Sequence, residues 1–237
     1  MAVMISHGDR GGCGKSTLTA TLGECILRKG LPLIVVDSDT QNPDASRYFN
    51  GSGATIHKID LRVPQGWREV LSLLEGEKTA DVLVNLPAGI GSVFDTRLSD
   101  LIAVSSELKR SLAVFWVMNR TPDSISLLGP VLSGCAKSPV QIVAVRNLYF
   151  GDAAKFTRWN ESKTREKLIS GGGLEIDLEE LDAPLVDATF GSLPPRRFSS
   201  NGETGLTYGE RYDLGKWMQK MTVTIDGISG RVGIGRW

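Results

Sequence analysis

The stretch that decides the fold lies at residues 9–17 and reads Asp9-Arg10-Gly11-Gly12-Cys13-Gly14-Lys15-Ser16-Thr17. An apolar run at residues 2–6 precedes it and predicts a strand, and a helical pattern at residues 15–29 follows it. Glycines let backbone N–H groups converge on phosphate oxygens, and a helix N-terminus adds the positive end of its dipole. Lys15 is expected to reach the outer phosphates of a nucleotide, and Ser16 to bind Mg²⁺. The structural alternative is a glycine-rich turn with a solvated lysine, and the strand–loop–helix order favours nucleotide binding over it.

The rest of the chain alternates apolar runs with amphipathic stretches. Runs at residues 33–36, 82–84, 112–118 and 140–145 predict buried parallel strands, and residues 174–178 are a further candidate. Helices are predicted at residues 15–29, 66–77, 93–109, 123–135, 152–169 and 205–221. This alternation predicts an α/β fold, a mostly parallel, doubly wound sheet with helices on both faces. With the loop at residues 9–17, the predicted fold resembles a P-loop NTPase sheet. We expect one domain over residues 1–237, with a core at about residues 1–195 and a peripheral helix and tail at 196–237. The glycine-spaced end from residue 227 is expected to be loosely ordered.

Composition excludes several classes of protein. Lys plus Arg and Asp plus Glu both number 27 in 237 residues, so the formal net charge is zero. That balance disfavours a protein that coats nucleic acid by bulk charge. No apolar stretch approaches the ~20 residues of a membrane-spanning helix, and no secretory signal is visible at the N-terminus. The three cysteines are widely spaced, and neither histidine belongs to a cluster of metal ligands. A reducing, cytoplasmic location is the expectation.

Four segments resemble the motifs of the ParA/MinD ATPases. Residues 10–17 resemble the deviant Walker A motif K-G-G-x-G-K-[ST]-T, although Asp9 stands where the general P-loop pattern has glycine. Residues 35–41 resemble the switch I segment, and residues 81–89 resemble switch II. Residues 184–194, from Pro184 to Pro194, resemble the late P-x-x-x-x-A…G-x-P segment. The length and the stretch at residues 147–165 resemble plasmid partition and conjugation proteins of the StbB/TraL kind.

This resemblance implies ATP and Mg²⁺ as cofactors and a homodimer bridged by ATP. It implies slow ATP hydrolysis coupled to DNA or a DNA-binding partner, in plasmid partition, stability or conjugative transfer. Membrane attachment of the MinD kind is not expected, because the last predicted helix and the tail lack the basic, strongly amphipathic character of a membrane-targeting helix. The implied catalytic residues are Lys15, Asp39, which would position the attacking water, and Arg10. The implied nucleotide-binding residues are Gly11, Gly12, Cys13, Gly14, Lys15, Ser16, Thr17, Asn147 and Pro184. The implied Mg²⁺ site consists of Ser16, Asp37 and Asn85.

Two residues depart from the family pattern. Arg10 replaces the lysine that reaches the partner subunit's phosphates; arginine keeps the charge but has a planar, forked head group. Asn85 replaces the switch II aspartate beside Mg²⁺, so the carbonyl acceptor stays and the negative charge is lost. Loss of such a partner commonly costs about 10–100-fold in affinity or activity. Asp37 could supply the missing carboxylate.

Other assignments stay open at this level. In the family, an asparagine after the strand that corresponds to residues 140–145 reads the adenine edge, and Asn147 is the candidate here. Asn119, after the previous predicted strand, is the competing candidate, and either residue could instead cap a loop. Cys13 could have its pKa lowered by the helix N-terminus and by Lys15, or it could simply fill a permissive position.

Two basic stretches are candidates for contact with DNA phosphates or for ordinary solvated surface. The first interleaves its cations with Phe156 and Trp159, and the second is Arg196-Arg197. The cations of the first stretch are Lys155, Arg158, Lys163, Arg165 and Lys167.

Two other functions compete with the switch. Asn85 motivates a nucleotide-dependent binding module with little or no turnover. The same phosphate loop also occurs in small-molecule kinases or ligases, of which a dethiobiotin-synthetase-like enzyme is an example.

Overall fold

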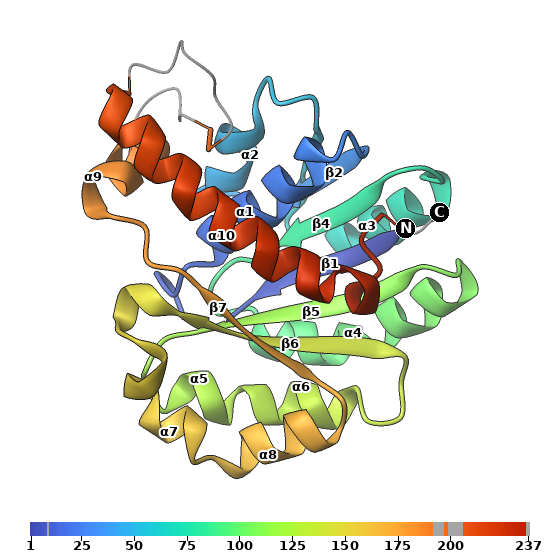
Figure 1. The fold of residues 1–237 in the computed structure, drawn as a ribbon. Coiled ribbons are helices and arrows are strands. Elements are labelled where there is room, and N and C mark those ends of the chain that lie inside the picture. Colours follow the sequence, from blue (N-terminus) through green and yellow to red (C-terminus); the bar gives the residue numbers. More distant parts are fainter. Residues whose placement is uncertain (9, 192–196, 199–205, 236–237) are drawn as a thin grey trace.

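One parallel sheet organises the structure, a computed structural model that describes residues 1–8, 10–191, 197–198 and 206–235. Within these residues seven strands pair in the order β3-β2-β4-β1-β5-β6-β7, and every pair is parallel (Figure 1). The strands are β1 (Ala2–His7), β2 (Leu33–Asp37), β3 (Thr55–Lys58), β4 (Asp81–Asn85), β5 (Ser111–Met118), β6 (Val140–Asn147) and β7 (Leu174–Leu178). The predicted α/β fold with a parallel sheet is confirmed.

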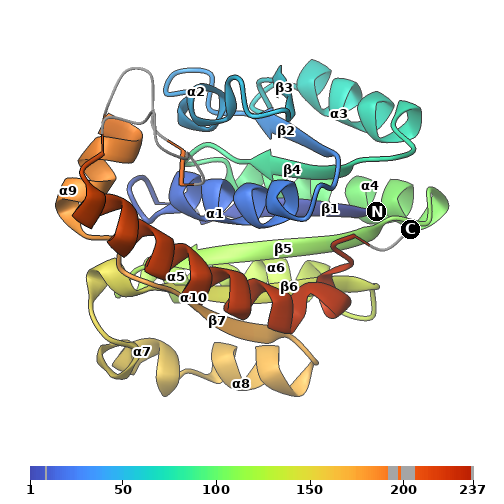
Figure 2. The ribbon, with the colours of Figure 1, turned by 45° about the horizontal axis from the view of Figure 1, so that its top comes forward.

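Helices cover both faces of the sheet, as Figures 1 and 2 show. One face carries α1 (Lys15–Arg28), α2 (Asp44–Phe49), α9 (Ala183–Val186) and α10 (Tyr208–Val232). The other face carries α3 (Pro64–Gly76), α4 (Gly91–Glu107), α5 (Asp123–Ser126), α6 (Leu128–Gly134), α7 (Thr157–Asn160) and α8 (Lys163–Ser170). Short helical turns lie at η1 (Leu148–Phe150), η2 (Ala153–Lys155) and η3 (Asp187–Gly191).

The continuous apolar runs of the central strands fill two cores. In β1, Ala2 and Met4 belong to the core beneath α1 and α10, whereas Val3 and Ile5 belong to the core beneath α3 and α4. Successive side chains of a strand point to opposite faces, so a strand buried on both faces must be apolar at every position. This requirement explains why these strands lack alternating polar residues.

The winding of the chain places the phosphate loop near the middle of the sheet, at the carboxyl ends of its strands. From the central β1 the chain passes to β2 and β3 on one side, and then through β4 to β5, β6 and β7 on the other. Because all strands are parallel, their carboxyl ends share one edge. In doubly wound folds, ligands bind at this edge, where the winding reverses.

Several predicted elements have different limits in the structure. Sequence analysis missed β3 and α2, which lie among glycines and polar residues. The predicted helix at residues 123–135 is two helices, α5 and α6, and the one at 152–169 is divided into η2, α7 and α8. Hydrophobic spacing detects a buried face but does not detect a break in the backbone between two helices that share it.

The C-terminal helix α10 is longer than predicted, and the expectation of loose order from residue 227 is wrong for residues 227–232. A capping box between Thr207 and Glu210 begins the helix. Ile225, Ile228 and Val232 are at most 8% exposed, so burial of its last turns outweighs the low helix propensity of its glycines. Within the described residues no helix is both long enough and apolar enough to span a bilayer.

Candidate nucleotide site

The loop between β1 and α1 provides backbone donors for phosphate. Gly12 has φ +71°, and Gly14, directly before α1, has φ +106°, a left-handed conformation that favours glycine. No side chain of the described residues caps the N-terminus of α1, so the first N–H groups of this helix are available as donors. Gly11 and Gly12 are exposed, and a side chain added at Gly12 would meet open space. The loop is therefore a cradle that fits a phosphate chain.

Lys15 extends its ammonium along the same loop. The side chain is 8% exposed, and its Nζ donates to the Arg10 carbonyl oxygen at 2.9 Å. The Ser6 hydroxyl donates to the Lys15 carbonyl oxygen at 3.1 Å and ties the start of α1 to β1. Among the described residues no carboxylate forms an ion pair with Lys15. A buried ammonium without a counterion is suited to an anionic ligand.

His7 at the end of β1 is a core residue. Its ring centroid lies 4.6 Å from those of both Phe94 and Trp116, and neither ring nitrogen has a hydrogen-bond partner within the described part of the chain. Burial, assisted by the charge of Lys15, lowers the pKa of His7 to about 3. His7 is therefore neutral at physiological pH. Within the described part of the chain no three His, Cys, Asp or Glu side chains gather as a metal site.

Cys13 is buried in the loop, and the idea that its pKa is lowered is wrong. The thiol is 1% exposed and contacts the Gly8 carbonyl oxygen at 3.8 Å and Lys15 Nζ at 3.9 Å. Burial raises the pKa of Cys13, and the positive charge of Lys15 opposes the shift without reversing it. Buried thiols react slowly because the thiolate is the nucleophile.

We expect the thiols of the native protein to resist alkylation at pH 8, with or without nucleotide. Cys13, Cys25 and Cys135 are all buried, and burial raises the pKa of each. Mass spectrometry after iodoacetamide treatment measures the labelling, with the urea-unfolded chain as the control that labels fully. Rapid labelling of native Cys13 would contradict a closed loop.

A buried polar network joins the ends of β2 and β4. Asp37 and Asn85 are opposite each other in the register of these strands. Asn85 Nδ2 donates to Asp37 Oδ1 at 3.1 Å, and Asn85 Oδ1 accepts from Thr19 Oγ1 at 3.1 Å. Asp37 Oδ2 accepts from the Ser46 N–H at 2.7 Å. Both polar atoms of Asn85 thus have protein partners, so this residue holds Asp37 in place.

The charge of the network lies on Asp37. The carboxylate is 0% exposed; burial raises its pKa, and the hydrogen bonds from Ser46 and Asn85 lower it in part. Ser16, at the start of α1, is partly exposed. A hydroxyl and a carboxylate are hard oxygen ligands of the kind that Mg²⁺ takes together with substrate phosphates. The donor set therefore fits Mg²⁺ through Ser16 and Asp37.

Asp39 lies two residues beyond β2, on the loop that leads to α2. Its side chain is partly buried, and Oδ1 accepts from the Asn42 N–H at 3.1 Å. The expected turn chemistry is therefore present. The carboxylate retains further lone pairs, since an ionised carboxylate accepts up to about four hydrogen bonds.

A hollow of about 350 Å³ leads from the phosphate loop toward β7 and α9. Its lining comprises Gly12, Gly14, Thr17, Asn147, Tyr149, Glu179, Leu181, Ala183, Val186 and Asp187. Of the two competing asparagines, only Asn147 lines it; Asn119 Oδ1 accepts from Thr121 and Ser124. Pro184 lies exposed on α9, between two lining residues, and Pro194 is outside the described residues.

Three residues at this site are not predicted from the sequence. Thr19 anchors Asn85 and lies one helical turn after Lys15, a spacing that could have indicated it. Tyr149 and Glu179 line the hollow. Tyr149 lies in a stretch that served only for the resemblance, and Glu179 carries no local signal.

Arg10 lies at the surface beside the site. Its guanidinium pairs with Asp123 on α5, and the side chains are 57% and 41% exposed. Exposed pairs of this kind contribute about 0–1 kcal/mol, so the contact can be broken at little cost.

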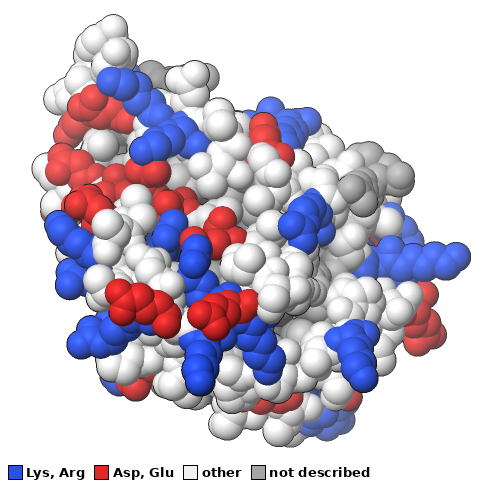
Figure 3. Space-filling model, turned by 60° about the horizontal axis from the view of Figure 1, so that its bottom comes forward, with Lys and Arg blue, Asp and Glu red and all other residues white. Residues whose placement is uncertain are grey.

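The candidate DNA-binding stretches are less basic in the structure than in the sequence. Figure 3 shows Lys and Arg interspersed with Asp and Glu on the lower face of the molecule. Lys155 pairs with Asp152, and Arg165 with Glu175. The interleaved aromatic residues, Phe156 and Trp159, are 1% exposed and belong to the core.

The second basic stretch is structural in its described part. Arg197 donates two hydrogen bonds to the fully buried Glu24, at 2.8 and 3.2 Å. Arg196 is outside the described residues. A guanidinium that neutralises a buried carboxylate is not available to phosphate.

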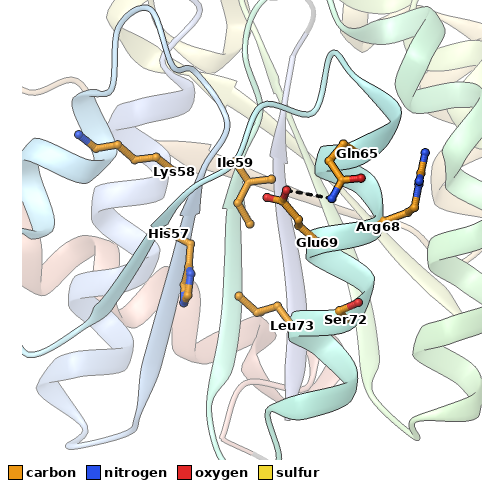
Figure 4. A pocket seen from close by; sticks show the side chains of 8 residues that line it. All are labelled: His57, Lys58, Ile59, Gln65, Arg68, Glu69, Ser72 and Leu73. Carbon is orange, nitrogen blue, oxygen red and sulfur yellow. Dashed lines mark hydrogen bonds between the residues drawn. The ribbon is translucent and has the colours of Figure 1, made fainter.

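A second hollow of about 430 Å³ lies at the β3 edge of the sheet, against α3. Figure 4 shows its lining, in which Gln65 donates to Glu69 at 3.3 Å. The lining includes the cations Lys58 and Arg68 and the carboxylate Glu69, and no residue of the phosphate loop. This hollow therefore does not belong to the candidate nucleotide site.

The chain is similar to known proteins in sequence and in fold. Residues 5–164 match the family described as the CobQ/CobB/MinD/ParA nucleotide binding domain. Protein MobD of Acidithiobacillus ferrooxidans is 28% identical over 232 residues, covering 96% of this chain and 97% of that protein. A chain of the MinC:MinD cell division protein complex of Aquifex aeolicus has a TM-score of 0.54 and 15% identity, covering 96% of both chains. A plasmid partition protein from Borrelia burgdorferi has a TM-score of 0.51 and 12% identity, covering 96% of this chain and 99% of that one. At such identities the structural likeness describes the fold alone.

Proposed function

Because the chain belongs to the CobQ/CobB/MinD/ParA family of nucleotide-binding domains, we propose that it is an ATP-driven dimerisation switch that hydrolyses ATP slowly. The observation that carries this proposal is the continuous hollow from the phosphate-loop glycines to α9, beside the buried Lys15, which has no ion-pair partner among the described residues. The sequence at residues 10–17 serves in this proposal as a deviant Walker A loop.

In this proposal the phosphates lie on the N–H groups of Gly11, Gly12 and Gly14, and Lys15 contacts the outer phosphates. Ser16 and Asp37 hold Mg²⁺, and Asn85 keeps Asp37 in position through its hydrogen bond. Bound Mg²⁺ would neutralise part of the negative charge on the phosphates. Phosphoryl transfer depends mainly on positioning and charge stabilisation.

Asp39 is the residue proposed to position the attacking water. Its partial exposure and its place on the loop after β2 support this role. Slow hydrolysis follows from Asn85, because an amide supplies no negative charge beside the metal. Asn85 also supports the second candidate, a nucleotide-dependent binding module with little or no turnover.

Steady-state phosphate release separates these two candidates. The switch predicts ATP-dependent release above that of the Lys15→Ala variant, measured with and without DNA. If the wild type released phosphate no faster than the Lys15→Ala variant, with and without DNA, the binding module would be the remaining candidate function.

Arg10 is proposed to reach the phosphates bound by the partner subunit once its pair with Asp123 opens. The weak, exposed pair supports this, since little free energy is needed to release the guanidinium. The process is plasmid partition, stability or conjugative transfer, with DNA or a DNA-binding protein as partner. The sequence resemblance to the StbB/TraL proteins supports this process.

We expect ATP, and not ADP, to convert the protein to a dimer in light scattering. A non-hydrolysable ATP analogue should give the same dimer, and Arg10→Ala should weaken dimerisation at least about tenfold, as loss of one charge-assisted contact does. Arg62→Ala is the matched control, because it breaks another exposed arginine–aspartate pair, near the β3 edge. A monomer in every nucleotide state would contradict the switch. If the Arg10→Ala variant dimerised as strongly as the wild type, the proposed role of Arg10 would be wrong.

A further inference from the structure

Tyr149 is an exposed aromatic residue at the nucleotide hollow. It lies on the short turn η1, directly after β6, and 59% of its surface is exposed. Its ring contacts Phe150 edge-on, with 5.3 Å between centroids, and Phe150 packs against the core. The ring is therefore braced on one side and open on another, and it lines the hollow.

Asn147 links the phosphate loop to the turn η1 through hydrogen bonds at both polar atoms of its side chain. Its Nδ2 donates to the Cys13 carbonyl oxygen at 2.8 Å, and its Oδ1 accepts from the Tyr149 N–H at 3.1 Å. The residue is 7% exposed. A side chain added at Gly14 would come within 2.3 Å of this amide, so phosphate loop and amide are closely fitted. The amide thus fixes Tyr149 relative to the phosphate loop.

The far wall of the hollow suits a flat, apolar group. Leu181, Ala183 and Val186 line it from the segment between β7 and η3. Glu179 and Asp187 place carboxylates in the lining, and Glu179 pairs with Lys220 at 2.7 Å. An aromatic ring, aliphatic side chains and a few polar groups are the usual composition of a site for a heterocyclic ligand.

We propose that Tyr149 stacks on the base of the bound nucleotide and sets the preference for a nucleoside triphosphate over a bare triphosphate. Asn147 is then a positioning residue that acts on the phosphate loop and on Tyr149. The inference rests on the proposed nucleotide binding and goes beyond it by separating base recognition from phosphate recognition. Stacking of a base on an aromatic side chain contributes an amount equivalent to roughly tenfold in affinity.

Calorimetric titration of the full chain with ATP and with inorganic tripolyphosphate, both with Mg²⁺, tests the inference. Tyr149→Ala should weaken ATP binding roughly tenfold and leave tripolyphosphate binding within about twofold, whereas Tyr149→Phe should retain ATP affinity. Asn147→Ala should weaken both ligands. Tyr208→Ala, which removes an exposed tyrosine from the first turn of α10, is the matched control.

The outcomes distinguish this inference from the proposed function. If the wild-type chain binds neither ligand, the proposed function fails. If the wild type binds ATP, two results for Tyr149→Ala would overturn base stacking while nucleotide binding stands. The first is an unchanged affinity for ATP. The second is an equal loss of affinity for ATP and tripolyphosphate with an unchanged melting temperature. If Asn147→Ala lost affinity for ATP but bound tripolyphosphate as the wild type does, the positioning role would be overturned. The Asn147 amide would then recognise the base itself.

Discussion

Lys15→Ala is expected to reduce ATP affinity by roughly 30- to 140-fold. The ammonium is buried in the phosphate loop and hydrogen-bonded to the Arg10 carbonyl oxygen, with no carboxylate paired to it among the described residues. A charge-assisted contact with phosphate contributes about 2–3 kcal/mol, and every 1.4 kcal/mol is a factor of ten. Calorimetric titration with ATP and Mg²⁺ measures the effect.

Two controls make the result specific. Lys78→Ala removes an exposed lysine from the turn between α3 and β4 and should leave ATP affinity unchanged. Thermal unfolding should show that the Lys15 variant is folded, because the change removes one side-chain contact and no strand or helix. Unaltered ATP affinity in the folded variant would show that the loop does not bind phosphate.

Asn85→Asp, which restores the residue type that the family pattern has, is expected to destabilise this chain by about 3 kcal/mol at pH 8. The new carboxylate would face Asp37 Oδ1 at the position from which Asn85 Nδ2 now donates at 3.1 Å. The substitution would replace a hydrogen bond with repulsion between two buried carboxylates. An uncompensated buried charge lowers the free energy of unfolding by about 3–5 kcal/mol. Urea unfolding followed by circular dichroism measures the loss.

The pH dependence of the variant follows from the same contact. Each carboxylate would raise the pKa of the other, adding to the upward shift that burial already gives Asp37. A carboxyl pKa that is higher in the folded than in the unfolded state contributes stability below the unfolded value, and that contribution is lost as pH rises through the folded pKa. The difference in unfolding free energy between the wild type and Asn85→Asp should therefore become smaller as the pH falls from 8 to 5.

An exchange of the two side chains provides the decisive control. In the double variant Asp37→Asn with Asn85→Asp, one amide and one carboxylate face each other again, with the donor on β2. Thr19 can still donate to residue 85, and the Ser46 N–H can still donate to residue 37, so most of the lost stability should return. Asn50→Asp, an exposed change of the same kind, should alter stability by less than about 0.5 kcal/mol. No recovery in the double variant would show that the 37–85 contact is not the cause.

Local sequence was sufficient for the phosphate loop and for most of the sheet. Glycine spacing around Lys15, an apolar run before it and a helical pattern after it are properties of neighbouring residues, and each has a direct backbone consequence. The same holds for the strand that ends at Asp37. Prediction was weaker where an element is short and polar, as for β3 and α2, or where packing overrides propensity, as in the last turns of α10.

The contacts of single site residues depended on long-range pairing. The sequence places Asn85 in the implied Mg²⁺ site, and the structure adds that its amide donates to Asp37, 48 residues away, because β2 and β4 pair in one register. The sequence makes Arg197 a candidate for DNA contact, yet it neutralises Glu24, which lies 173 residues away in the chain. Asn147 reaches Cys13 across 134 residues.

By itself the sequence determined that this chain has a glycine-rich phosphate loop between a strand and a helix, on a parallel α/β sheet, because those features arise from residues close together in the chain. Only the tertiary structure decided that Asn85 orients a carboxylate, that Asn147 ties two loops together and that Tyr149 lies open at the hollow. Hydrogen-bond partners and burial depend on which distant strands become neighbours, and that arrangement is a property of the whole fold.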